Sequence, residues 1–113
     1  MEPLDALLET ALQIPPERLN MYQYYTDPKS GEALLAGRGS ACLAGWHMAR
    51  HQDLHDLYTQ PGALPFDIWQ DYFGISEREV IALFYNGLAT KDDLILEILL
   101  AKKNRMEAED ERS

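Results

Sequence analysis

The segment formed by residues 37–50 most constrains how this chain can fold. It opens with Gly37 and Gly39 and then reads as a helix with small residues on one face and large apolar residues on the other. Small side chains let neighbouring helices approach closely, and large apolar side chains supply buried area. Ser40 is the expected N-cap, because its hydroxyl can accept hydrogen bonds from the unpaired amides of the first turn. We therefore predict a central helix that begins at about Ala41.

Further helices, separated by clear breakers, are expected on both sides of this segment. Apolar residues recur at helical spacing over residues 3–13, and Pro15 and Pro16 must end that helix. A short apolar helix is expected to stop at Gly74. Ser76, followed three residues later by a glutamate, predicts a capping box, and Thr90 is expected to cap the last helix.

Two helix boundaries follow from weaker signals. Asn86 and Gly87 tolerate the left-handed conformation that closes a helix, so we expect the helix after Ser76 to end there. After Arg50, polar residues take the positions that small residues occupy earlier in the helix. The central helix therefore either continues with this polar face exposed to solvent or kinks here. The sequence leaves both alternatives open.

The sequence predicts an all-α fold, a single compact domain of about five helices with irregular connections. The domain is assigned to residues 1–105, and residues 106–113 to an acidic, frayed tail. The central helix is expected to pack between the helix after Ser76 and the last helix. The predicted core is apolar and largely aromatic: Leu8, Leu43, Trp46, Trp69, Phe73, Val80, Phe84, Leu94 and Ile98.

Charge narrows the classes of partner. The 113 residues include 19 acidic and 10 basic residues, for a formal net charge of −9, which repels phosphate backbones and argues against direct binding to nucleic acid. The same charge suits a basic protein partner, or mimicry of nucleic acid toward a protein that normally binds it. No leader and no apolar run of about 20 residues is seen, so we expect a cytoplasmic protein without a membrane partner.

Several motifs resemble those of a loose family of small helical proteins from bacteria and phages. They are the segment 42–46 (Cys-Leu-Ala-Gly-Trp), the segment 74–80 (Gly-Ile-Ser-Glu-Arg-Glu-Val) and the segment 83–85 (Leu-Phe-Tyr). Many members carry a second cysteine where this chain has Gly37, so a role that needs a cysteine pair does not transfer. The resemblance implies an all-helical single domain, and it supplies no catalytic residues.

The three histidines are the candidates for metal binding. His47, His51 and His55 are spaced four residues apart, so a continuous helix would place them on one side. Two imidazoles one turn apart can hold zinc or nickel. The alternatives are a surface or partly buried row, or a face that becomes charged at mildly acidic pH. We predict no resident cofactor.

Two further features near the start of the central helix could carry chemistry. Cys42 would lie just past the expected cap, where the helix dipole favours a reactive thiolate, although cysteine is also often simply buried. Arg38, Gly39 and Ser40 could bind an anion through backbone amides and an adjacent positive charge, although loop geometry alone also explains the glycines.

For function, we predict a non-enzymatic protein that acts by protein–protein interaction. The expected partner-binding residues are Tyr22, Tyr24, Tyr25, Asp53 and Asp56. The three tyrosines could instead pack over the hydrophobic core and shield it from solvent. A sharper version is a phage or mobile-element inhibitor that occupies the nucleic-acid-binding site of a host protein. The rival is a metal- or redox-responsive sensor, or a small enzyme, built on the histidine row or Cys42. The apolar stripe of the last helix fits either one chain or a homodimer.

Overall fold

The fold is all-α, as predicted. The computed structural model describes residues 2–21, 28–37, 39–58 and 60–112, and the predicted partner-binding residues Tyr22, Tyr24 and Tyr25, like Arg38, lie outside this part. Regular structure within it consists of seven α-helices and one 3-10 turn. The elements are α1 (Pro3–Gln13), η1 (Pro16–Arg18), α2 (Pro28–Leu35), α3 (Leu43–Arg50), α4 (Gln52–Tyr58), α5 (Pro65–Phe73), α6 (Glu77–Phe84) and α7 (Lys91–Arg112).

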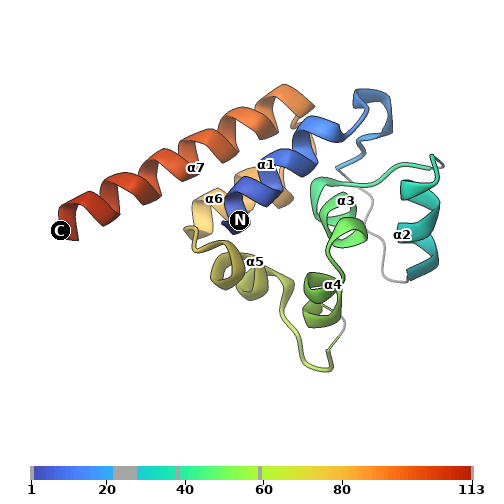
Figure 1. Cartoon of the computed structure of the whole chain (residues 1–113), viewed down its shortest axis with the longest axis horizontal. Coiled ribbons are helices and arrows are strands. Elements are labelled where there is room, and N and C mark those ends of the chain that lie inside the picture. Colours follow the sequence, from blue (N-terminus) through green and yellow to red (C-terminus); the bar gives the residue numbers. More distant parts are fainter. Residues whose placement is uncertain (1, 22–27, 38, 59, 113) are drawn as a thin grey trace.

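The helices surround α3, with α7 along one edge of the molecule (Figure 1). The central helix packs against α1, α2, α4 and α6. The long helix α7 instead lies on α1 and α6, which corrects the expectation that α3 would pack between α6 and α7. The first helix thus fills the position that we had assigned to the last.

Local signals set most helix boundaries. Proline occupies the first position of α1 and of α5, and Gly74 closes α5 in the left-handed region at φ 64°. The capping box before α6 is present, with the Ser76 hydroxyl accepting from the Glu79 amide at 3.2 Å. The Thr90 hydroxyl accepts from the amide of Asp93 in the same way, at 3.2 Å.

Three boundaries differ from the predictions. Helix α3 begins at Leu43 with Cys42 at the N-cap, so Ser40 is not the cap. Helix α6 ends at Phe84, and neither Asn86 nor Gly87 takes the left-handed conformation. Helix α7 continues to Arg112, so residues 106–112, assigned above to a frayed tail, are helical; Met, Glu, Ala and Arg in this stretch are good helix formers.

The core lies where α1, α3, α5, α6 and α7 meet. Eight of the nine predicted core residues are buried; Leu8 is only partly buried and packs at the edge. Aromatic rings fill the centre: Phe84 lies 5.3 Å from Trp69 and 5.7 Å from Phe73, measured between ring centroids. Aromatic pairs at these separations add to the stabilisation that burial provides.

Candidate functional site

Two adjoining helices, α4 and α5, each carry two exposed acidic residues. Asp53 and Asp56 on α4 and Asp67 and Asp71 on α5 are all exposed, and the two helices pack against each other. We call these four residues the acidic face. Two of them, Asp53 and Asp56, are predicted partner-binding residues, and the structure places both at the surface.

Neighbouring side chains hold the two carboxylates of α4. The Tyr72 hydroxyl donates to Oδ2 of Asp53 at 3.3 Å, and Nε2 of Gln52 donates to Oδ1 of Asp56 at 2.9 Å. Burial raises the pKa of the Tyr72 phenol, and the charge of Asp53 and the hydrogen bond to it raise that pKa further. Tyr72 therefore keeps its proton and remains a donor to Asp53 at neutral pH.

No basic residue neutralises this surface within its own stretch of chain. Residues 51–77 contain five acidic residues, the four of the acidic face and Glu77, and no lysine or arginine. This segment therefore contributes five negative charges to the formal net charge of −9. Sequence reasoning missed Asp67 and Asp71, although the absence of lysine and arginine between Arg50 and Arg78 could have indicated them.

The histidine row is broken at its middle member. His51 is the C-cap of α3 with φ −131° and ψ 94°, so the chain kinks there, and α4 starts in a new direction. The ring centroids of His47 and His51 are 4.3 Å apart. His55 is buried on α4, where its Nδ1 lies 3.2 Å from Nε2 of Gln52. In the part of the chain that the structure describes, no three His, Cys, Asp or Glu side chains form a group that could hold a metal ion.

His47 is a core residue. Its side chain is fully buried, its Nδ1 lies 2.8 Å from the hydroxyl of Thr10, and its Nε2 has no hydrogen-bond partner among the described residues. The pKa of His47 is lowered to about 3. Burial is the largest cause, and the electrostatic effects of the nearby His51 and Arg50 add to it. His47 is therefore neutral at physiological pH.

Cys42 is also a core residue. At the N-cap of α3 it is completely buried, and burial raises the pKa of its thiol, although backbone amides of Gly45 and Ala44 act in the opposite direction. The sequence offered two alternatives for Cys42, a thiolate favoured by the helix N-terminus and a simply buried thiol. The structure shows the buried thiol, and desolvation outweighs the effect of the amides on its pKa. A buried, protonated thiol is a poor nucleophile.

Arg18 accounts for the glycine-rich loop before α3. Its guanidinium donates to the carbonyls of Gly39 at 2.8 Å and Leu34 at 3.0 Å, and it lies 4.8 Å from the centroid of the Trp46 ring. The amide of Ala41 donates to the Arg18 carbonyl at 3.2 Å. The loop therefore turns its Gly39 carbonyl toward Arg18. Gly39 and Ser40 belong to the predicted anion site. The contacts with Arg18 give a structural reason for their loop conformation that does not require a bound anion.

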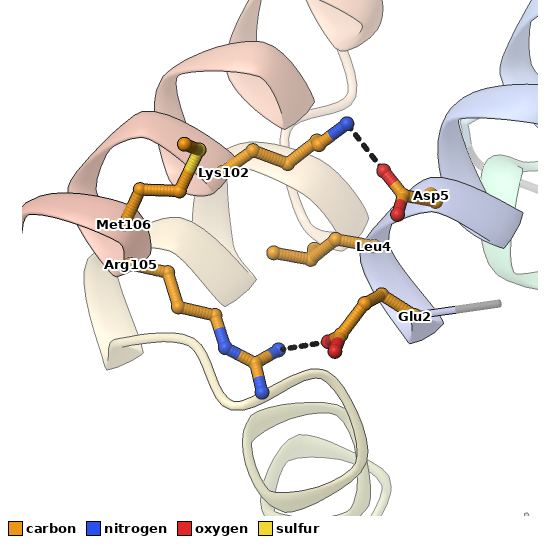
Figure 2. A pocket seen from close by; sticks show the side chains of 6 residues that line it. All are labelled: Glu2, Leu4, Asp5, Lys102, Arg105 and Met106. Atoms are coloured by element: carbon orange, nitrogen blue, oxygen red, sulfur yellow. Dashed lines mark ion pairs between the residues drawn. The ribbon is translucent and has the colours of Figure 1, made fainter. Parts of the chain in front are cut away.

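A hollow lies between α1 and α7 (Figure 2). It has a volume of about 280 Å³ and is lined by Glu2, Leu4, Asp5, Lys102, Arg105 and Met106. Lys102 forms an ion pair with Asp5, and Nη1 of Arg105 lies 3.5 Å from Oε2 of Glu2. Its four charges therefore balance one another, which suits a brace between α1 and α7 better than a site for a charged ligand.

No described helix is both long and apolar enough to span a bilayer. Comparison with known proteins adds no relative: no family model, no curated protein and no solved structure matches the chain. The resemblance to the bacterial and phage family stays a prediction, and the case for function rests on the surfaces described above.

Proposed function

We propose that this protein works by binding another protein, and that the acidic face of α4 and α5 docks on a basic surface of that partner. One observation carries the proposal: four aspartates are exposed on two adjoining helices within a stretch, 51–77, that has no lysine or arginine. Such a surface attracts a basic partner over long range and repels acidic ones.

The sharper form of the proposal is that the partner is a nucleic-acid-binding protein, whose binding site the acidic face occupies. Sites that bind phosphate backbones are rich in lysine and arginine, and carboxylates can pair with the same groups. In this form the chain acts as an inhibitor that competes with nucleic acid. Leu57 and Leu64 are exposed and lie close to Asp56 and Asp67 in the sequence. They would add apolar contacts with the partner.

The test is affinity capture from a bacterial lysate, followed by elution with double-stranded DNA. The wild-type chain is compared with a variant in which all four aspartates of the acidic face are changed to asparagine. A control variant carries Glu17, Glu32, Glu97 and Glu107 changed to glutamine, which removes the same charge from other parts of the surface.

We expect the wild type and the control to retain a protein that DNA releases, and the four-aspartate variant to lose it. Equal capture by the wild type and both variants would show that the acidic face is not the docking surface. A partner that is captured through the acidic face but is not released by DNA would support binding and rule out competition with nucleic acid.

A further inference from the structure

Helix α7 has apolar residues on two opposite sides. Leu94, Ile98 and Ala101 are buried against the rest of the fold. On the opposite side, Leu96 is 57% exposed and Leu99 is 46% exposed. Figure 1 shows α7 at the edge of the molecule, with α1 and α6 on its inner side. Nothing in the described chain covers the outer side.

The outer side carries a regular stripe of four exposed residues. Asp92, Leu96, Leu99 and Lys103 follow one another at intervals of four, three and four residues, which keeps them on one line along about three helical turns. This is the spacing of a seam between two paired helices. Among the described residues, neither Asp92 nor Lys103 forms an ion pair within the chain.

We propose that a second copy of this chain covers the stripe, with the two α7 helices antiparallel. In that arrangement Asp92 faces Lys103 of the second copy, and Leu96 faces Leu99 of the second copy. The twofold axis repeats both contacts, because residue i meets residue j and j meets i in such an interface. Two leucine layers thus lie between two ion pairs.

The charges select this orientation. In a parallel pair in register, Asp92 would face another Asp92 and Lys103 another Lys103, and like charges that meet at an interface disfavour it. Because each end of the stripe carries the charge that the other end needs, the stripe is complementary to itself when reversed. This self-complementarity favours a second copy over an unrelated partner.

The inference is independent of the proposed function, since it uses a different surface. In Figure 1, α4 lies on the side of the molecule away from α7. The α4 part of the acidic face therefore stays open in the dimer, which would present two copies of it to a partner. Pairing of α7 can be tested without any partner present.

The first test measures the mass of the purified chain by sedimentation equilibrium. An interface of two leucine layers and two ion pairs is small and suits weak association, so the concentration runs from about 10 µM to about 1 mM. We expect the wild type to move from monomer to dimer over this range, and Leu99→Glu to stay monomeric with an unchanged far-UV circular dichroism spectrum. A wild type that is monomeric throughout, or a Leu99→Glu variant that dimerises like the wild type, would overturn the proposal.

The second test exchanges the charges. Asp92→Lys and Lys103→Asp, each alone, place like charges opposite each other and should weaken dimerisation at least about tenfold. The double variant restores opposite charges and should dimerise nearly as well as the wild type. Failure of the double variant to recover would exclude the antiparallel pairing. Melting curves of all three variants check that the monomer fold is intact.

Discussion

The hydroxyl of Thr10 lies 2.8 Å from Nδ1 of His47, at a buried contact between α1 and α3. The same hydroxyl oxygen accepts from Nη1 of Arg50 at 3.0 Å and lies 3.2 Å from the carbonyl of Ala6. The hydroxyl has one proton, which it can donate either to Nδ1 of His47 or to the carbonyl of Ala6. When it donates to Ala6, Nδ1 of His47 carries a proton and donates to the hydroxyl oxygen. One hydroxyl therefore joins α1 to α3.

The lowered pKa of His47 predicts a loss of stability in acid. The folded chain holds this pKa at about 3, against about 6.5 when unfolded, so the unfolded state binds the proton more readily. The free energy of unfolding should be highest above pH 6.5 and fall by roughly 1.4 kcal/mol per pH unit below it, down to the folded pKa. Urea denaturation between pH 7.5 and about pH 4.5 measures this slope.

Carboxylates titrate in the same range, so the slope needs a control. His47→Asn does not titrate, and its amide can take the position of Nδ1 toward Thr10. We expect this variant to be less stable at pH 7.5 and to have a shallower pH dependence. The same slope in both chains would show that His47 does not gain a proton on unfolding.

Replacing Thr10 by valine should destabilise the fold by about 2 kcal/mol, since it removes one buried hydroxyl and leaves polar atoms of His47 and Arg50 without that partner. Thr10→Ser keeps the hydroxyl and should lose distinctly less. Chemical denaturation followed by circular dichroism gives both values. A valine variant as stable as the wild type would mean that the hydroxyl contributes little.

Burial of Cys42 predicts slow reaction of its thiol. At pH 8 a disulfide reagent should modify the native chain at least about 100-fold more slowly than the chain in denaturant, because reaction requires an opening of the fold. The combined variant Cys42→Ala with Leu88→Cys carries an exposed thiol outside the α7 stripe and should react rapidly in both conditions. Rapid modification of native Cys42 would contradict its placement in the core.

The contacts of Arg18 predict that arginine is needed at this position. Arg18→Ala removes two hydrogen bonds and the contact with the Trp46 ring, and should cost about 2 kcal/mol of stability. Arg18→Lys has one ammonium group and cannot reach both carbonyls with the same planar geometry, so it should recover only part of the loss. Equal stability of the lysine variant and the wild type would show that charge alone suffices.

Helix boundaries could be predicted where the signal is local. Pro3, Gly74, Ser76 and Thr90 act on backbone groups within about one turn of themselves, so their effect is visible in the sequence. The helical spacing of the apolar residues likewise predicted the all-α fold, and eight of the nine residues expected in the core are buried.

Tertiary structure decided everything that depends on contacts between distant segments. The same apolar spacing on α7 left open which leucines face the core, and the positions of α1 and α6 bury Ile98 while exposing Leu99. The thiol of Cys42 stays protonated and the ring of His47 stays neutral because the surrounding helices exclude water from both side chains. No local sequence pattern reveals that exclusion. The sequence by itself thus determined the helices and the excess of acid, whereas packing decided which faces stay exposed, since burial is a property of neighbours far apart in the chain.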